Sequence, residues 1–370
     1  MCDNRCQVHR FTYKIYRMKY NYNWTLKDAV FTKDKGKVFS CFACGGGSTM
    51  GYKLSGFDVL GCNEIDPKMM EAYQKNHNPK YSYLEPIQTF KLRDDLPDEL
   101  YNLDILDGSP PCSSFSVSGN REKDWGKEKK FREGQANQVL DELFFDFIDL
   151  AKKLQPKVVI AENVKGLLMG EAKAYVRRIY KEFDKCGYMV QHFLLDASKM
   201  GVPQRRERVF FIALRKDLCN QFLEQKDMFT IIPKIQLDFN DKEIQFKEIF
   251  IDKLDRKLST KQLILWENRI FGDIDFSKSS ERIGENPNAH FNYKYLYMDK
   301  VANTITGSDN CVLFDYPRFR NFDELCECGT YPKDYDFRKN KPEYLIGMSV
   351  PPVMTARIAD EIYEQWLKHL

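Results

Sequence analysis

The sequence predicts an α/β fold with a parallel sheet, followed by a second, smaller domain. Between residues 37 and 215, short apolar runs typical of buried strands alternate with segments of helical periodicity, the order found in parallel sheets. The first apolar run leads into Gly45, Gly46 and Gly47 and then into a helix, as at many nucleotide sites. After residue 215 this alternation stops, and short apolar runs mix with Asp, Asn, Lys and aromatic residues. The change indicates a smaller domain with few regular helices.

Each expected element follows from its local pattern. Short apolar runs predict strands at residues 38–43, 58–64, 103–108, 158–161 and 209–214. The first helix is expected to begin at Ser48, and further helices at residues 67–76, 138–154, 172–186 and 354–370. Pro67 suits the first turn of a helix, and Gly187 suits the position just after one. The chain then divides into an extension (1–34), a first domain (35–215), a second domain (216–342) and a C-terminal segment (343–370).

Composition excludes several classes of protein. With 43% hydrophobic and 14% aromatic residues, the chain can bury a sizeable core, which excludes a disordered protein. No stretch reaches the roughly 18 apolar residues of a membrane helix, and residues 1–23 lack the apolar region of a secretory signal. The 11 cysteines are spread through a large chain, unlike those of a small disulfide scaffold. We therefore expect a cytoplasmic protein with reduced thiols and no membrane association.

Net charge does not by itself indicate a nucleic-acid partner. Lys+Arg 57 against Asp+Glu 54 leave +3, and residues 216–300 hold 14 basic and 15 acidic residues. Any positive surface must therefore come from basic residues that are grouped locally. The candidate segments are residues 116–134, the cluster at 205–208, and the basic, tyrosine-rich extension 1–34. We interpret the extension as loosely ordered, with a nucleic-acid-binding arm as the alternative.

The glycine-rich turn predicts a nucleotide-type site. Glycines let the backbone approach a ligand, and the following helix offers free N–H groups. Glu64 lies 20 residues after Cys44, at the end of the second expected strand, where an acid can accept hydrogen bonds from ribose hydroxyls. A merely tight turn is the alternative. Cys41 and Cys44 are not accompanied by a second pair at zinc spacing, so no metal is expected.

A second group of residues predicts nucleophilic chemistry. Cys112 follows two prolines at the carboxyl end of an expected strand, where ligands bind in open α/β sheets; a rigidly aimed cysteine is a candidate nucleophile. Glu162 ends the next strand at the same edge. Arg206 and Arg208, in the run 204–208, stand at the start of the strand at 209–214. A structural cysteine and a solvated charge cluster are the alternatives.

In this order, these segments resemble the DNA cytosine-5 methyltransferase family. The matching segments are residues 42–47, 63–66, 111–112, 162–164 and 204–208, and residues 347–351 are similar to the family's Gly-Asn-Ser-Val-Pro. The resemblance implies a Rossmann-like, S-adenosylmethionine-dependent methyltransferase fold with a smaller target-recognition domain. Residues 35–215 would be catalytic, residues 216–342 would read DNA, and residues 343–370 would return to the catalytic domain.

The resemblance also implies an enzyme that methylates C5 of a flipped-out cytosine in double-stranded DNA. Cys112 would add to C6 of the ring. Glu162 would hold or protonate N3, and Arg208, with Arg206 nearby, would orient the base or the acid. Residues 116–134 resemble the family's mobile active-site loop. We expect a monomer, and a cognate restriction endonuclease that acts separately is compatible with the resemblance.

The implied cofactor is S-adenosyl-L-methionine. Glu64 would take its ribose hydroxyls, and Phe42 and Ile65 would pack near the adenine and ribose. The full set of matching positions is Phe42, Gly45, Gly46, Gly47, Glu64, Ile65, Ile87, Pro111 and Ser349.

The sequence departs from the family pattern at several positions. Ser40 stands where the family usually has an acid near the amino-acid end of the cofactor, and Cys44 stands where it usually has glycine. Pro86 replaces an Asp that accepts from the adenine, and Glu85 is a neighbouring substitute. Ser113 and Met348 replace Gln and Asn. None of these changes removes Cys112, Glu162 or Arg208, so an active enzyme is expected.

Three other functions were weighed. An RNA cytosine-5 methyltransferase of the transfer-RNA type would use the same chemistry, but the short motif of that subgroup is not seen. A non-catalytic DNA-binding module would have no use for the Cys112, Glu162 and Arg208 set. A flavin or NAD oxidoreductase does not fit the glycine spacing.

Overall fold

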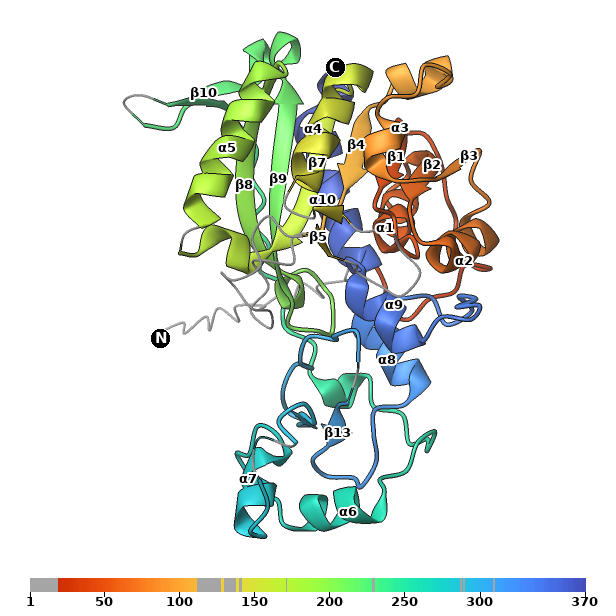
Figure 1. The fold of residues 1–370 in the computed structure, drawn as a ribbon, viewed down its shortest axis with the longest axis vertical. Helices are drawn as coiled ribbons and strands as arrows, with labels where there is room; N and C mark the ends of the chain where they lie inside the picture. Colours follow the sequence, from red (N-terminus) through yellow and green to blue (C-terminus); the bar gives the residue numbers. More distant parts are fainter. Residues whose placement is uncertain are drawn as a thin grey trace, which may run out of the picture.

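The computed structural model describes residues 19–111, 128–129, 138–139, 142–170, 172–227, 230–286, 288, 290–308 and 310–370, with backbone alone at 128–129 and 138–139. Its centre is a seven-stranded sheet in the order β3-β2-β1-β4-β7-β9-β8 (Figure 1). The strands are β1 (Lys37–Cys41), β2 (Asp58–Glu64), β3 (Tyr81–Leu84), β4 (Ile105–Gly108), β7 (Val158–Val164), β8 (Tyr188–Asp196) and β9 (Glu207–Arg215).

The predicted α/β architecture is confirmed, but the sheet is mixed. β1, β2, β3, β4 and β7 pair in parallel, whereas β9 runs antiparallel to both β7 and β8. The prediction of a wholly parallel sheet is therefore wrong for the strand at 209–214. β8 was not predicted, because half of its residues are partly or fully exposed and it lacks a continuous apolar run. It directly follows helix α5 and forms an antiparallel pair with β9.

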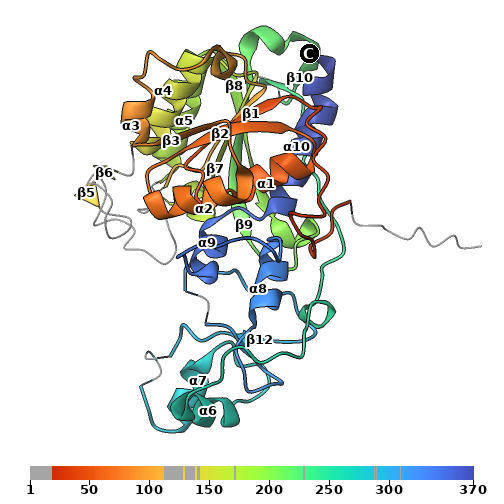
Figure 2. The same ribbon diagram turned by 90° about the vertical axis from the view of Figure 1, so that its right-hand side faces the viewer.

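Helices cover both faces of the sheet (Figures 1 and 2). One face packs against α3 (Ile87–Phe90), α4 (Leu143–Leu154) and α5 (Ala172–Lys185) around a large apolar core. The other packs against α1 (Gly47–Leu54) and α10 (Pro352–Gln365). α2 (Pro67–His77) begins at Asp66, whose side chain caps the helix by accepting from Lys68 N and Met69 N. Side chains alternate between the two faces along each strand. This alternation determines which side chains come together at the strand ends.

Two helices differ from their predicted bounds. The helix expected at residues 138–154 begins only at Leu143, and Gln138–Val139 instead form the short strand β6, which pairs with β5 (Glu128–Lys129). The C-terminal helix begins at Pro352, slightly earlier than predicted, and crosses α1 closely. At the crossing, a Cβ added at Gly51 would lie 2.5 Å from Pro352 O, so only glycine permits this approach.

The region after β9 has short elements, as predicted. It contains β10 (Leu223–Gln225), β11 (Ile231–Pro233), α6 (Thr260–Glu267), α7 (Phe276–Arg282), β12 (Tyr295–Leu296), β13 (Val312–Leu313), α8 (Phe322–Gly329) and α9 (Pro342–Met348). In both ribbon views α6 and α7 lie beyond one end of the sheet, with α8 and α9 between them and the sheet. The domain bounds proposed from the sequence stay a prediction.

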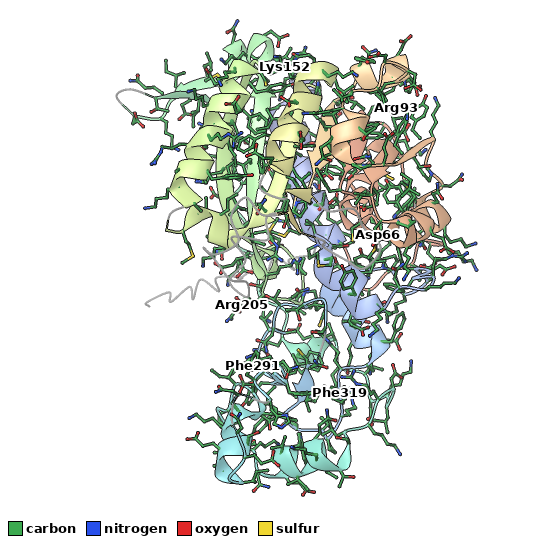
Figure 3. The ribbon with its side chains drawn as sticks, viewed as in Figure 1. Asp66, Arg93, Lys152, Arg205, Phe291 and Phe319 are labelled. Atoms are coloured by element: carbon green, nitrogen blue, oxygen red, sulfur yellow. The ribbon has the colours of Figure 1, made fainter. Side chains whose placement is uncertain are left out.

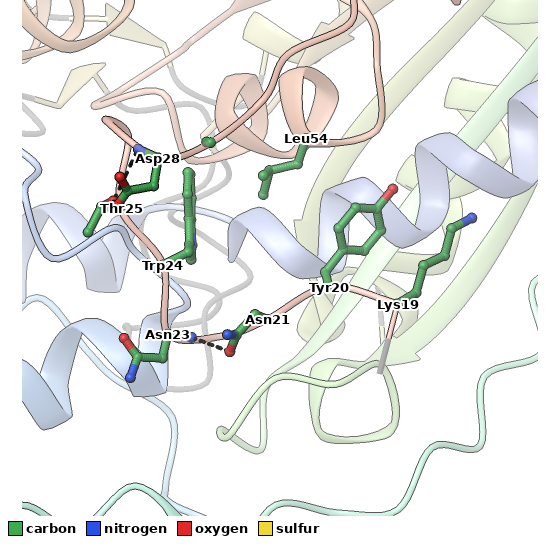
Figure 4. A pocket seen from close by; sticks show the side chains of 9 residues that line it. Lys19, Tyr20, Asn21, Asn23, Trp24, Thr25, Asp28 and Leu54 are labelled. Carbon is green, nitrogen blue, oxygen red and sulfur yellow. Dashed lines mark hydrogen bonds between the residues drawn. The ribbon is translucent and has the colours of Figure 1, made fainter. Parts of the chain in front are cut away.

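The described part of the N-terminal extension is tied to the body of the protein. Tyr20 donates to Asp360 of α10 at 2.6 Å, and Trp24 Nε1 donates to Thr330 O at 2.9 Å. Loose order is therefore the wrong description for residues 19–34. This segment lines a cavity of about 460 Å³ beside Leu54 (Figure 4). Among the helices that the structure describes, none is long and apolar enough to cross a membrane.

Candidate active site

Glu162 and Arg208 meet at one edge of the sheet. Glu162 lies in β7 and Arg208 at the start of β9, one diagonal step apart in the antiparallel pair. Arg208 Nε lies 2.9 Å from Glu162 Oε1, and each side chain keeps some exposure, 17% and 13% respectively. A charged pair that is neither buried nor fully solvated can contact a substrate and still hold its own geometry. The two residues expected to act on the base are thus brought together.

The loop that leads to Cys112 is attached to the same strand. Asn163 is buried, and its Nδ2 donates to Pro110 O at 3.2 Å. Pro111 follows at the carboxyl end of β4, partly exposed. Cys112 itself and residues 113–127 lie outside the described residues, so their predicted roles stay predictions. Asn163 stands within the matched Glu-Asn-Val segment, but its contact with Pro110 is visible only in the structure.

Arg206 has a different environment from Arg208. It is 3% exposed, and its Nη1 and Nη2 donate to Ile305 O at 3.2 Å and Gly347 O at 3.0 Å. Burial, together with the positive charge of Arg208, lowers its pKa to about 9. These bonds connect the start of β9 to a loop before β13 and to the C-terminal segment. The contact explains the position of Arg206, whereas its part in catalysis stays a prediction.

The glycine-rich turn has an unusual backbone. Phe42, Cys44 and Gly46 have φ of 53°, 50° and 83°, a region that bulky residues rarely adopt. A Cβ added at Gly46 would lie 2.2 Å from His77 Nε2, and one added at Gly47 would lie 2.5 Å from Val350 O. Glycine is therefore required at both positions. The strain at Phe42 and Cys44 is of the kind that persists at ligand-binding turns.

Glu64 supports this turn from the end of β2. Its Oε2 accepts from Cys44 N at 2.8 Å, and its Oε1 accepts from Ile65 N and Asp66 N, each at 2.9 Å. The side chain is 7% exposed, and burial raises the pKa of its carboxyl group. A carboxylate accepts about four hydrogen bonds, so Oε2 can still accept from a ligand hydroxyl. The ribose-binding role expected of Glu64 stays a prediction.

Two further side chains hold the turn in place, and the sequence identified neither. His77, at the end of α2, contacts Gly45 O through Nε2 at 3.2 Å, and Tyr335 OH donates to the same oxygen at 2.5 Å. Burial lowers the pKa of His77 to about 3, so the ring is neutral and Nε2 carries the donated proton. Both residues come from segments far from the turn in sequence. Only the tertiary structure could reveal them.

The remaining predicted cofactor positions surround the turn. Phe42 and Ile65 are partly exposed, and Ile87 is buried at the start of α3. Ser349 is buried, accepts from Tyr331 OH at 2.6 Å and donates to Leu345 O at 2.8 Å. Its hydroxyl therefore ties the C-terminal segment to Tyr331, and its Cβ lies against the turn, 2.7 Å from where a Cβ at Gly47 would stand.

Glu85, the neighbouring substitute for the family's Asp at the position of Pro86, already forms an ion pair. Its Oε1 pairs with Arg93 Nη1 at 2.9 Å (Arg93 is labelled in Figure 3). No group of three or more potential metal ligands is found among the described residues.

The sheet order, with one antiparallel strand and helices on both faces, defines an α/β methyltransferase fold of the S-adenosylmethionine-dependent type. The chain belongs to the C-5 cytosine-specific DNA methylase family, whose sequence profile matches residues 36–364. This confirms the resemblance inferred from the motifs.

The chain is also similar to several Type II methyltransferases. The chain is 37% identical over 182 residues to Type II methyltransferase M.FnuDI of Fusobacterium nucleatum, which covers 49% of this chain and 48% of that protein. It is 27% identical over 341 residues to Type II methyltransferase M1.HphI of Haemophilus parahaemolyticus, covering 87% and 85%. The aligned part spans about half the length of M.FnuDI.

Solved structures show the same fold. A Spodoptera frugiperda DNMT2 variant superposes with a TM-score of 0.60 at 18% identity, covering 88% of this chain and 99% of that chain. S. pombe Dnmt2 superposes with a TM-score of 0.56 at 15% identity, covering 88% and 98%. At such identities the likeness concerns the fold alone.

Proposed function

We propose that this protein transfers a methyl group from S-adenosylmethionine to C5 of cytosine in double-stranded DNA, through a covalent bond between Cys112 and C6 of the base. The observation that carries the proposal is the Glu162–Arg208 pair, 2.9 Å apart, beside the loop that Asn163 holds at Pro110. Family membership supports the choice of substrate. The names of the Type II relatives support a role in restriction-modification.

The proposed chemistry assigns a separate task to each residue. The Cys112 thiolate adds to C6 and forms the S–C6 bond, which makes C5 nucleophilic. Glu162 gives or holds a proton at N3, where negative charge builds up as sulfur adds. Arg208 keeps Glu162 oriented and stabilises charge on the base. After C5 is methylated, a base removes the C5 proton and the S–C6 bond breaks, which regenerates Cys112.

The residues present fit the proposed cofactor. Glu64 accepts three backbone hydrogen bonds and retains an acceptor position at Oε2 for a ribose hydroxyl. When bound, S-adenosylmethionine supplies an electrophilic methyl group. Glu64, the turn and Ser349 would hold it at the carboxyl ends of β1 and β2, next to Pro111.

The DNA would lie between the sheet and the region of residues 216–342. Exposed Arg205 stands at the junction of these two parts (Figure 3). Backbone phosphates attract such a residue and so position the duplex. Because the target atoms of cytosine are inaccessible in a duplex, the base would have to flip out, at a cost of a few kcal/mol.

Label transfer tests the proposal. The full chain is incubated with tritiated S-adenosylmethionine and either duplex DNA or transfer RNA. We expect label in duplex DNA as 5-methylcytosine, with none for Cys112→Ala. Cys186→Ala is the matched control, because this half-buried thiol lies near the end of α5, away from the site, and it should keep full activity. Label in RNA alone, or no label, would contradict the proposal.

The covalent step has its own test. A duplex with 5-fluorocytosine at the target position should trap the adduct, because fluorine cannot leave as a proton does. Peptide mapping should find the modified base on Cys112 and not on Cys186. Bisulfite sequencing of DNA from expressing cells gives the target sequence.

A further inference from the structure

Asp107 is a buried acid to which neither the sequence motifs nor the proposed chemistry assigns a role. It lies in β4, one residue before Gly108, and is 4% exposed. Its strand neighbours are Ser40 of β1 on one side and Ile160 of β7 on the other. Asp107 therefore lies at the centre of the sheet, close to the carboxyl end of β4, where the loop to Pro111 begins beside strand β7.

Hydroxyl groups from two elements hold this carboxylate. Ser40 Oγ donates to Oδ2 at 2.8 Å, and Tyr52 OH of α1 donates to Oδ1 at 3.0 Å. The side chain of Ser48, in the first turn of α1, is a third hydrogen-bonding group. Asp107 thus joins β1, β4 and the start of α1, the three segments that bring the glycine-rich turn and Pro111 together.

Among the described residues, Asp107 has no lysine or arginine partner within ion-pair distance. A buried carboxylate without a cation is costly, and burial raises the pKa of Asp107 to about 7. The negative charge of Glu162 contributes to this rise in pKa, whereas the hydrogen bonds from Ser40, Tyr52 and Ser48 oppose it. The other titratable groups that interact with Asp107 are Cys41 of β1 and Tyr73 of α2.

We propose that Asp107 is a positioning residue of the cofactor site, and that binding of the cationic cofactor favours its carboxylate form. This inference rests on the proposed use of S-adenosylmethionine. The cofactor carries positive charge, and it would bind at the turn that starts α1, so it supplies the countercharge that Asp107 lacks. In this family an acid usually stands at the position of Ser40. In this protein the acid is Asp107, on the neighbouring strand β4, and Ser40 donates a hydrogen bond to it.

The sign of the pH effect follows from the raised pKa. Without cofactor, native Asp107 keeps its proton up to about pH 7, whereas Asp107 of the unfolded chain loses it near pH 3.8. The contribution of Asp107 to the free energy of unfolding is therefore present at low pH and is lost as pH rises through about 7. Asp107→Asn should therefore melt no lower than the wild type at pH 8. The same variant should bind the cofactor more weakly, which separates loss of function from loss of fold.

Calorimetric titration of S-adenosylmethionine into the full chain tests the proposal. The titration is run at several pH values between pH 6 and pH 8, in two buffers of different ionisation enthalpy, which gives the number of protons released. The wild type should release protons on binding, and the largest number at pH 6. Its affinity should rise about tenfold over this range. Asp107→Asn should lose both effects and bind about tenfold more weakly at pH 8. Tyr52→Phe keeps the carboxylate but removes a hydrogen bond that lowers its pKa, so the midpoint should move to higher pH.

Asp104→Asn is the matched control. Asp104 precedes β4, at the strand's opposite end, and pairs with Lys157 at 2.9 Å; its replacement should leave the proton count and the affinity unchanged. Wild-type affinity and proton release in Asp107→Asn at every pH would overturn the inference. A wild type that binds no S-adenosylmethionine would overturn both this inference and the proposed function. Normal binding behaviour without methyl transfer to DNA would overturn the proposed function alone.

Discussion

Asn163 of β7 donates a hydrogen bond from Nδ2 to the carbonyl oxygen of Pro110, 3.2 Å away. The two residues are separated by 53 positions in the sequence. The bond joins the loop that leads to the proposed nucleophile to the strand that carries the proposed acid. The position of the Pro110–Pro111 turn relative to Glu162 therefore depends on this contact.

Asn163→Ala should slow methyl transfer without weakening cofactor binding. The change removes one hydrogen bond and frees the Pro110–Pro111 turn, so a decrease in kcat of about tenfold is expected from poorer alignment. Steady-state kinetics with duplex DNA measures it. Asn102→Ala is the matched control, because Asn102 also donates to a backbone carbonyl, Asp98 O, at an exposed site. Equal kcat in the two variants would exclude a positioning role for Asn163.

Arg208→Ala should reduce kcat by about 100-fold, the order expected when a group that stabilises developing charge is removed. Because Arg208 is partly exposed, the fold should be kept. Arg208→Lys retains the charge but not the planar guanidinium, so it should recover only part of the activity. Arg215→Ala, at the other end of β9, is the control. The assignment fails if Arg208→Ala turns over at the wild-type rate.

Most of the sheet could be predicted from the sequence, but not its direction everywhere. The strand at residues 58–64 coincides with β2, because a buried parallel strand is a continuous apolar run. Such a run does not reveal strand direction, so the pattern predicts a parallel strand at residues 209–214, where β9 is antiparallel. β8 is an edge strand with alternating exposure, and the pattern gave too weak a signal. Direction and edge position are decided by contacts between distant segments.

The same distinction applies to the candidate site. Glu162, Arg208 and Glu64 could be identified because each stands at a strand end next to a recognisable pattern. Asp107 and His77 could not, since their partners lie in other elements: Ser40 is 67 residues from Asp107, and Gly45 is 32 residues from His77. Nothing in the local sequence distinguishes either residue from an ordinary buried polar group.

Arg206→Met should destabilise the protein far more than a typical surface substitution. The change leaves the carbonyl oxygens of Ile305 and Gly347 without their buried donor, which should lower the free energy of unfolding by about 3 kcal/mol. Urea unfolding measures it. Arg178→Met is the control, because Arg178 pairs with Glu142 at the surface and should cost less than about 1 kcal/mol. Equal losses would show that Arg206 does not hold these segments together.

The neutral His77 should make the protein sensitive to mild acid. Burial lowers the pKa of His77 from 6.5 to about 3, so its contribution to stability is present above pH 6.5 and is lost as pH falls toward 3. Between pH 7.5 and pH 5, this loss amounts to about 2 kcal/mol. His77→Gln can still donate to Gly45 O but cannot titrate, so its free energy of unfolding should fall by about 2 kcal/mol less than that of the wild type over this range. Urea unfolding at the two pH values, with the exposed His369→Gln as control, measures the difference, and identical pH dependence in wild type and His77→Gln would show that His77 is not held neutral.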